Sequence, residues 1–371
     1  MIKVLHCYKT YYPDTFGGIE QVIYQLAEGG GRAGIESTVF THSPHGASNN
    51  EKIDSHSIYR VKTLCEFAST PFSFKAIRDF KALAAVADII HYHFPYPFMD
   101  FMHFASRIKK PSVVSYHSDI VKQKSLLKIY SPLMNGFLKS VDRIVAASPN
   151  YVESSPTLQQ FKNKVDVIPY GLDKKFYQNT SSAVLDKWRA RFRSGFFLFV
   201  GTFRYYKGLH ILIEAAQNSV YPIVVVGAGP IEAELKYQAD QLGVNNIFFL
   251  GALENEDKSA LLQLCTCLVF PSHLRSEAFG ISLLEGALYS KPLISSEIGT
   301  GTTYINIDKL TGLVVPPSNP AALRAAMDSI WNNPSQAQIY GKAAYERFEA
   351  LFTADRMIES YTNLYNSLLN K

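Results

Sequence analysis

A chain of 371 residues, of which 47% are hydrophobic and 19% charged, is too long for one compact core and too apolar to stay disordered, so we expect two folded domains. No uninterrupted apolar run reaches the roughly 18 residues that a spanning helix needs, and the apolar stretch at the amino terminus is too short for a signal peptide, so we expect a cytoplasmic protein. The net charge of +5 is concentrated in the first half, which suits an anionic partner such as phosphate or a lipid surface, or is ordinary solubility charge.

Short apolar runs alternate with amphipathic segments through the first half, which is typical of βα units in a parallel sheet. The strands that we expect are 2–8, 37–42, 58–62, 88–93, 111–117, 143–148 and 165–170. Helical patterns separate most of them. The first half therefore predicts one doubly wound α/β domain.

A polar stretch at 178–195 interrupts this pattern, and a second series of strands follows. These strands are expected at 196–201, 222–227, 246–251, 266–272, 292–296 and 312–317. The rest of the chain predicts two or three helices, the last at about 353–369. We therefore predict two Rossmann-like domains, at 1–180 and 181–371, with the last helix packing back on the first domain.

Two features of the first half lie where a strand meets a helix. Ligands of open α/β sheets bind beyond the carboxyl ends of the strands, where helix N-termini offer unpaired N–H groups. Gly17 and Gly18 precede a helix, so their amides either face a diphosphate or only shape the turn. His117 ends the strand 111–117, where it either contacts a ligand or has a structural role.

Cations and glycines occupy the corresponding loops of the second half. Arg204 and Lys207 follow the strand 196–201, so they either neutralise a diphosphate or are solvated surface charges. Gly227 and Gly229 lie in GAGPIE, which lacks the third glycine of a dinucleotide fingerprint. We interpret GAGPIE as a tight turn beside a nucleotide, and the defective pattern disfavours an NAD-dependent oxidoreductase.

The stretch SEAFGISLLE, residues 276–285, places a Phe-Gly break directly after an apolar strand. Gly280, preceded by Phe279, lets the backbone approach a ligand closely. A helix is expected to begin near Ile281, so that its amino end points at an anion.

Two carboxylates flank this break. Glu277 lies in the loop and Glu285 about one turn inside the helix, so both can face one crevice. Carboxylates repel phosphate and bind hydroxyls, so we expect one on a ribose and the other on a sugar ring. The alternative for Glu285 is a structural cap, since Ser282 and Glu285 have the spacing of a capping box.

Together these motifs resemble glycosyltransferase family 4, whose members have the GT-B fold: two facing Rossmann-like, doubly wound domains with a crossing carboxyl-terminal helix. The resemblance covers nearly the whole chain. The matching stretches are FGGIE at 16–20, SYHSD at 115–119, AASPNYV at 146–152, VIPYGLD at 167–173, YYKGLHILIEA at 205–215, VVGAGP at 225–230, PS at 271–272 and E-x7-E at 277–285.

The resemblance implies a retaining enzyme that takes a sugar from a nucleotide diphosphate sugar and needs no other cofactor. It implies that Glu277 binds sugar hydroxyls, that Glu285 holds the ribose and that Lys207 pairs with the diphosphate. The further residues for which it implies contacts with the phosphates or the transferred sugar are Gly17, Gly18, Phe279, Gly280, Ile281 and His117.

Three positions depart from the usual family pattern. Thr202 stands where an arginine is usual, and we assign the role of that arginine to Arg204. Tyr170 replaces an asparagine, and Ala228 an acidic residue. These departures bear on donor preference.

Several motifs are absent from the sequence. There is no D-x-D, with which many sugar transferases hold a divalent ion, so cations and helix ends must balance the diphosphate and we expect no metal. The four cysteines have no C-x-x-C spacing and three of them lie in apolar surroundings, so we favour buried thiols over metal ligands. The modest basic charge and the lack of a recognisable module disfavour nucleic-acid binding.

The stretches H-x-H-F-P-x-P at 91–97 and YYKGL at 205–209 are most similar to bacterial mannosyltransferases that build O-antigen or capsular chains. The resemblance therefore favours GDP-mannose as the donor, with a UDP-sugar as the alternative. Rival functions from other classes are a GT-B nucleotide-sugar epimerase and a non-catalytic nucleotide-sugar binding protein.

The segment 119–140 alternates lysines with apolar residues, and aromatic stretches at 67–80 and 93–104 accompany it. On a helix this pattern fits either contact with an anionic bilayer or packing inside the domain. We expect a lipid-linked saccharide acceptor, handled at the cytoplasmic face of the inner membrane, with peripheral contact between protein and membrane.

Overall fold

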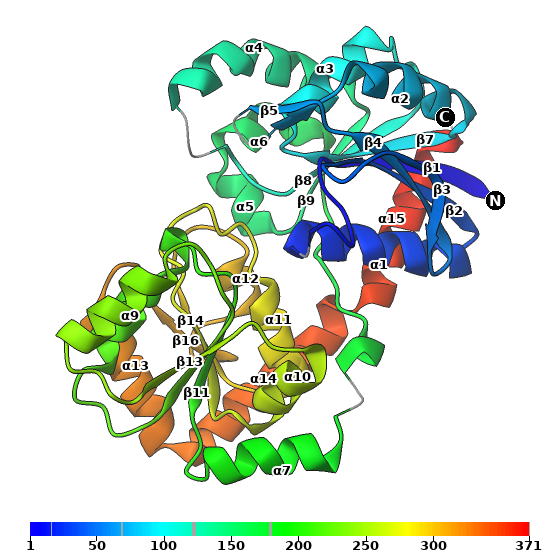
Figure 1. The fold of residues 1–371 in the computed structure, drawn as a ribbon. Helices are drawn as coiled ribbons and strands as arrows, with labels where there is room; N and C mark the ends of the chain where they lie inside the picture. The colour runs from blue at the N-terminus through cyan, green and yellow to red at the C-terminus, as the bar shows by residue number, and fades with distance from the viewer. Residues whose placement is uncertain (16, 68–69, 121–123, 178–179, 371) are drawn as a thin grey trace. The chain divides into compact units, whose positions relative to one another are not determined.

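The computed structural model describes residues 1–15, 17–67, 70–120, 124–177 and 180–370. Phe16 of the FGGIE stretch and Lys122 of the lysine-rich segment lie outside the described residues. The chain forms two compact units (Figure 1). Unit 1 comprises Met1–Gly171 and Ala354–Lys371, and unit 2 comprises Leu172–Thr353.

The division falls after Gly171, earlier in the chain than the predicted boundary after residue 180. The segment that follows packs within unit 2. Leu172 N–H donates to Phe352 O at 2.9 Å, and the Tyr177 hydroxyl donates to Glu285 Oε1 at 2.9 Å. The division precedes the predicted one because these contacts are tertiary, and a change in composition along the chain does not reveal them.

Unit 1 contains an eight-stranded sheet in the order β10-β9-β8-β7-β1-β2-β4-β3. Its strands are β1 (Ile2–Cys7), β2 (Ile35–Ser43), β3 (Ser48–Ile53), β4 (His56–Lys62), β7 (Ile89–Phe94), β8 (Ser112–Tyr116), β9 (Arg143–Ala146) and β10 (Val165–Val167). All are parallel except β3, which pairs antiparallel with β4 at the edge. The polar strand β3 was not predicted, nor was the small hairpin of β5 (Cys65–Phe67) and β6 (Thr70–Phe72).

Helices connect the strands of unit 1. They are α1 (Gly18–Arg32), α2 (Phe74–Val86), α3 (Pro97–Ala105), α4 (Lys124–Ser140), α5 (Pro149–Ser154), α6 (Pro156–Gln160) and the short 3-10 helix η1 (Lys162–Lys164). The last helix of the chain, α15 (Ala354–Leu369), also belongs to unit 1 and lies beside α1 (Figure 1). Its Tyr361 and Tyr365 hydroxyls lie 2.6 Å from Ser115 Oγ and 2.7 Å from His91 Nδ1, so α15 closes over the buried sheet.

Unit 2 contains a six-stranded parallel sheet in the order β13-β12-β11-β14-β15-β16. Its strands are β11 (Phe197–Val200), β12 (Ile223–Val226), β13 (Ile247–Gly251), β14 (Cys267–Phe270), β15 (Leu293–Ser296) and β16 (Gly312–Val315). All six predicted strands are present. The order is that of a Rossmann fold, in which the chain reverses direction across the sheet between β11 and β14.

The helical elements of unit 2 are η2 (Lys174–Tyr177), α7 (Ser182–Arg191), η3 (Tyr205–Lys207), α8 (Leu209–Ala216), α9 (Glu232–Gln241), α10 (Asn255–Leu264), α11 (Ile281–Leu288), α12 (Thr302–Ile305), α13 (Pro320–Asn332) and α14 (Pro334–Leu351). With α15, the last two make three helices after the final strand, where two or three were expected. In the part of the chain that the structure describes, every helix is too short or too polar to span a bilayer.

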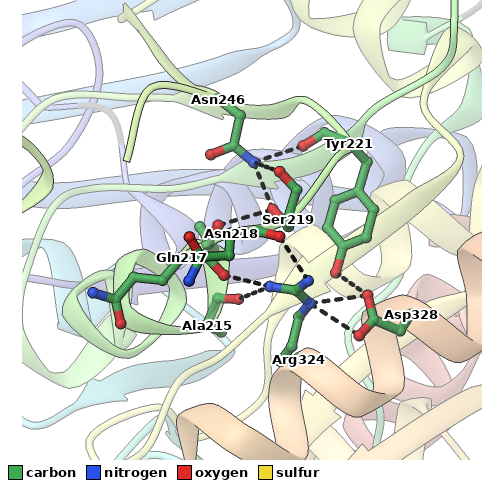
Figure 2. A network of polar contacts seen from close by, with 9 residues as sticks. Ala215, Gln217, Asn218, Ser219, Tyr221, Asn246, Arg324 and Asp328 are labelled. Atoms are coloured by element: carbon green, nitrogen blue, oxygen red, sulfur yellow. Dashed lines mark hydrogen bonds and ion pairs between the residues drawn. The ribbon is translucent and has the colours of Figure 1, made fainter. Parts of the chain in front are cut away.

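A polar network fixes the turn between α8 and β12 (Figure 2). The Arg324 guanidinium of α13 donates to three carbonyls at the end of α8 and beyond it, those of Ala215, Gln217 and Asn218. The same side chain pairs with Asp328, with Nε 2.9 Å from each carboxylate oxygen. A cation at a helix carboxyl end satisfies carbonyls that have no partner within the helix. This network therefore holds the connection at the amino end of β12, opposite to the end at which ligands of such sheets bind.

Removing one hydroxyl from α15 is expected to destabilise unit 1. Tyr365→Phe leaves the buried Nδ1 of His91 without its partner, which should reduce the free energy of unfolding by about 1–3 kcal/mol. Urea titration followed by circular dichroism measures this change. The control is Tyr237→Phe on the exposed face of α9, and equal stability of the two variants would contradict the assignment.

Candidate active site

The loops after β11 and β14 meet at the point where the strand order of unit 2 reverses. The His273 N–H of the second loop donates to Tyr206 O of the first at 3.0 Å. The region beyond the strand ends at such a switch point is where open α/β sheets bind ligands. The predicted residues in these two loops are Arg204, Lys207, Glu277, Phe279 and Gly280.

Lys207 and Glu277 form an ion pair between the two loops. Nζ lies 2.5 Å from Glu277 Oε2, and only 12% and 11% of the two side chains are exposed. The Ser272 hydroxyl donates to the same Oε2 at 3.2 Å, and Nζ lies 4.8 Å from the centre of the Phe270 ring. Burial acts to lower the pKa of Lys207, but the attraction of Glu277 and of other neighbours outweighs burial, so the net shift is upward and the amine stays charged.

Glu285 is fixed by two residues that the sequence did not predict. Its Oε1 accepts from the Tyr177 hydroxyl at 2.9 Å and from Lys258 Nζ at 2.8 Å. The Glu285 side chain is buried, and the Lys258 Nζ lies 5.5 Å from the centre of the Tyr177 ring. The second carboxylate therefore has its own lysine.

The helix α11 begins at Ile281, as predicted, after Gly280 with a φ of 101°. This left-handed conformation favours glycine. Ser282 Oγ donates to Val200 O at 2.8 Å rather than capping the helix, so the capping-box interpretation of Glu285 is wrong. The first N–H groups of α11 have no carbonyl partner within the helix and make its start suitable for an anion.

The two carboxylates share one arrangement, in which a lysine and a hydroxyl hold one oxygen. Among the described residues, neither Glu277 Oε1 nor Glu285 Oε2 has a hydrogen-bond partner, so each carboxylate keeps one oxygen for a ligand hydroxyl. Lys207 and Lys258 balance the negative charge, which lets an anionic group approach. The Phe279 side chain is buried, so this residue offers a ligand its backbone only.

Gly227 and Gly229 have a packing role. A Cβ on Gly227 would overlap Gly201 O, and one on Gly229 would overlap Phe203 O. Both glycines therefore let the loop after β12 pack directly against the loop after β11. The Arg204 side chain is exposed. Nucleotide contacts of these three predicted residues stay predictions.

In unit 1, Gly17 precedes α1, which begins at Gly18. The Glu20 carboxylate accepts from Thr10 Oγ1 at 2.9 Å and from Thr15 Oγ1 at 2.7 Å, and a Cβ on Gly17 would overlap that carboxylate. Gly17 therefore makes room for a side chain that ties down the loop. A contact of Gly17 and Gly18 with phosphate stays a prediction.

His117 belongs to a chain of hydrogen-bonded rings inside unit 1. Its Nε2 lies 2.9 Å from His93 Nδ1, and its Nδ1 contacts the Tyr170 hydroxyl. His93 Nε2 in turn lies 3.2 Å from His6 Nδ1. Both nitrogens of His117 are occupied, so the predicted contact with a sugar requires that one of these partners be released.

Three buried histidines lie close enough to share a metal ion, with ligand nitrogens of His6, His91 and His93 within 4.8 Å of one another. His91, however, is hydrogen-bonded through both nitrogens. Nε2 lies 2.7 Å from Ser115 Oγ, and Nδ1 lies 2.7 Å from the Tyr365 hydroxyl. Hydrogen bonds between neutral rings account for the arrangement.

Three residues that shape these sites were missed from the sequence. Tyr177 lies before the predicted boundary, and Lys258 lies in the first turn of α10, directly after the loop that follows β13. Tyr177 has no local signal, whereas the position of Lys258 just beyond a strand end is one. Glu20 also has one, since an acid follows the Gly-Gly pair in the first turn of a predicted helix.

Comparison with known proteins covers nearly the whole chain. Residues 16–176 match the model of Glycosyltransferase Family 4, and residues 185–347 that of Glycosyl transferases group 1. An O-antigen chain mannosyltransferase C of Escherichia coli is 55% identical over 368 residues, which are 99% of this chain and 99% of that protein. D-rhamnosyltransferase WbpZ of Pseudomonas aeruginosa is 56% identical over 353 residues, 95% of this chain and 93% of that protein.

Solved structures share the fold at low sequence identity. Sucrose-phosphate synthase from Thermosynechococcus elongatus has a TM-score of 0.80 and 20% identity over 100% of both chains. Anabaena Alr3699/HepE, solved in complex with UDP and glucose, has a TM-score of 0.78 and 19% identity over 99% of this chain and 100% of that one. The predicted α/β GT-B fold is confirmed.

Mild acid is expected to destabilise unit 1. Burial lowers the pKa of His117 to about 3, and burial together with His56 lowers that of His6 to about 3, from 6.5. Between these values the unfolded chain binds more protons than the folded one, so stability falls as pH decreases. The loss is about 2 kcal/mol per histidine at about pH 5, to be measured by urea titration with circular dichroism.

The fluorescence of Trp188 and Trp331 gives an internal control for this prediction, because the only two tryptophans lie in unit 2. Acid should therefore shift the circular dichroism transition more than the fluorescence transition. A urea midpoint of unit 1 that stays constant between neutral and mildly acid solution would show that the histidines are not held neutral.

Breaking the buried ion pair of unit 2 is expected to cost more than breaking an exposed one. Lys207→Ala leaves the Glu277 charge buried without its partner, which should lower the free energy of unfolding by about 3–5 kcal/mol. Lys342→Ala breaks the exposed pair with Glu346 and should change stability little. Tryptophan fluorescence in urea measures both variants, and equal midpoints would be the contradicting result.

Proposed function

Because this chain belongs to glycosyltransferase family 4, we propose that it transfers a mannosyl residue from GDP-mannose to a saccharide acceptor in bacterial O-antigen synthesis. The proposal draws on the two relatives that match nearly the full chain, one named a mannosyltransferase and the other a D-rhamnosyltransferase. D-rhamnose is 6-deoxy-D-mannose, so both names describe sugars that differ only in the hydroxyl on C6.

The observation that carries the proposal is the pair of lysine-held carboxylates beside the start of α11. Breaking the bond between a sugar and a diphosphate builds negative charge on the leaving group. Lys207 and the amide groups of α11 would stabilise that charge, with Arg204 as a further cation. The free oxygens of Glu277 and Glu285 would accept hydrogen bonds from the sugar and the ribose.

We further propose that transfer retains the anomeric configuration without an enzyme nucleophile. The acceptor hydroxyl would attack the anomeric carbon on the face that the diphosphate leaves, and a phosphate oxygen of the leaving group would take the hydroxyl proton. The new glycosidic bond then replaces the bond to phosphate. No general base is assigned. Lys207 and the start of α11 would balance the charge of the diphosphate in place of a divalent ion, so transfer is proposed to be independent of metal.

The acceptor is proposed to be a lipid-linked saccharide at the cytoplasmic face of the membrane. The relative named an O-antigen chain mannosyltransferase supports a saccharide acceptor, and its attachment to a lipid is our proposal. A UDP-sugar as donor is the alternative within the family.

A donor screen tests the proposal. We expect transfer from GDP-mannose to a lipid-linked saccharide in the presence of EDTA, with the retained linkage identified by NMR. Glu277→Gln keeps the size of the side chain but weakens the ion pair with Lys207, and should lower kcat at least about 100-fold. The exposed Glu346→Gln is the matched control and should leave kcat unchanged.

Several outcomes would contradict parts of this proposal. Tighter binding of UDP than of GDP in calorimetry would contradict guanine as the nucleobase of the donor. Faster transfer from GDP-D-rhamnose would contradict mannose as the transferred sugar. Epimerisation of the donor without acceptor would favour an epimerase. Donor binding without turnover on any acceptor would favour a binding protein.

A further inference from the structure

Exposed apolar side chains gather at one end of unit 1. We name this set the apolar belt, and it consists of Leu64, Phe67, Phe74, Phe101, Phe104 and Ile129. Phe74 is 87% exposed and Ile129 80%. Apolar residues exposed singly are common, whereas a group of six with four phenylalanines marks an interaction surface.

Contacts between elements make the belt one surface. The Phe72 ring of β6 lies 4.9 Å from that of Phe98 in α3, and Phe98 stacks on Phe101 at 6.2 Å. On the other side of α3, Asp100 accepts from the Tyr130 hydroxyl of α4. The elements α2, α3, α4 and β5 lie together in Figure 1. The belt therefore runs from the hairpin across α3 to α4.

The hairpin, α3 and α4, which carry most of the belt, each follow a strand at the carboxyl edge of the sheet. The hairpin follows β4, α3 follows β7 and α4 follows β8, and these three strands run in the same direction. Their carboxyl ends therefore share one edge. Phe74 starts α2 directly after the hairpin, and His117 directly follows β8 at this edge.

Basic residues accompany the belt. Lysine and arginine outnumber aspartate and glutamate between residues 62 and 140. The exposed members next to belt residues or to their helices are Lys75, Arg78, Arg107, Lys109 and Lys128. Glu66 of the hairpin is exposed, whereas Asp79 is buried beside Lys75 and Arg78, and Asp100 is buried against Tyr130, so the exposed basic residues outnumber the exposed acid. The surface charge is therefore positive.

We propose that the apolar belt docks unit 1 on an anionic phospholipid bilayer. The phenylalanine rings would enter the boundary between headgroups and acyl chains, while the surrounding lysines and arginines pair with anionic headgroups. Charge complementarity selects this occupant, because aromatic residues inside a basic rim match an anionic interface. The inference rests on the proposed function, since it places a lipid-linked saccharide at the sheet edge where His117 lies.

The surface draws more on the aromatic stretches at 67–80 and 93–104 than on the segment 119–140, all three of which the sequence pointed to. Met134 of that segment is buried, whereas Ile129 and Lys128 are exposed. Most of the belt comes instead from the hairpin, the start of α2 and the outer face of α3. The apolar side of α4 packs partly against its own domain, which agrees with the alternative of packing inside the domain for that side, and contact of the segment 119–140 with a bilayer stays a prediction.

Vesicle flotation of the full chain tests the inference. Vesicles of phosphatidylglycerol with phosphatidylethanolamine should retain the protein, and vesicles of phosphatidylcholine alone should retain little. The double variant Phe67→Ser/Phe74→Ser should lower the partition coefficient at least about tenfold. The matched control is Val220→Ser/Tyr237→Ser, which removes two equally exposed apolar side chains from unit 2 and should leave the partition coefficient unchanged.

Three results would overturn the docking proposal: no retention of the unaltered protein, equal loss in both double variants, or equal retention on both kinds of vesicle. A dimer in solution that Phe67→Ser/Phe74→Ser dissolves, without vesicle binding, would assign the belt to a second copy of the chain. Transfer to a soluble acceptor should be unchanged in that variant. Vesicle binding without any transfer would contradict the proposed function and leave the docking intact.

Discussion

The buried ion pair of Lys207 and Glu277 determines how charge is balanced at the candidate site of unit 2. Removing either Lys207 or Glu277 from water alone would cost several kcal/mol, so each is tolerated in its place only because the other is there. The pair joins the loops after β11 and β14 and therefore sets their spacing before a ligand arrives. It also cancels the charge of an acid that lies close to the start of α11, where an anion is favoured. The second pair, Lys258 with Glu285, balances a buried carboxylate in the same way, and Glu285 lies about one turn inside α11.

The sequence allowed prediction of the strands and the strand-end loops, but not of the partners inside the site. Strands buried on both faces are continuous apolar runs and are readable, whereas the edge strand β3, SNNEKI, is polar and was missed. The rule that ligands bind at strand ends pointed to Lys207 and Glu277 separately. No spacing relates these two positions, because their contact follows from the sheet order. Lys258 lies on a helix with an ordinary surface composition, and only the fold brings it to Glu285.

The histidines of unit 1 are a clearer example of contacts that the sequence does not predict. His6, His93 and His117 come from three parts of the chain, on β1, on β7 and directly after β8. Their contact depends on the register of parallel strands, in which His6 is opposite His91 and His93 is opposite Ser115. Periodicity shows which face of a strand is buried, but it does not specify register against a neighbour.

The predicted residues His117 and Lys207 lie in different kinds of buried polar arrangement, one in each unit. Unit 2 buries charged pairs such as Lys207 with Glu277, which suits the recognition of a charged diphosphate and its hydroxyl-bearing sugars. In unit 1, His117 lies in a chain of buried rings that ends at Tyr170, which stands in place of the usual family asparagine. A neutral imidazole can both donate and accept, as sugar hydroxyls do, without the desolvation cost of a buried ion. The rings around His117 would therefore suit the uncharged sugar proposed above, and the ion pair of Lys207 and Glu277 would suit the proposed charged donor.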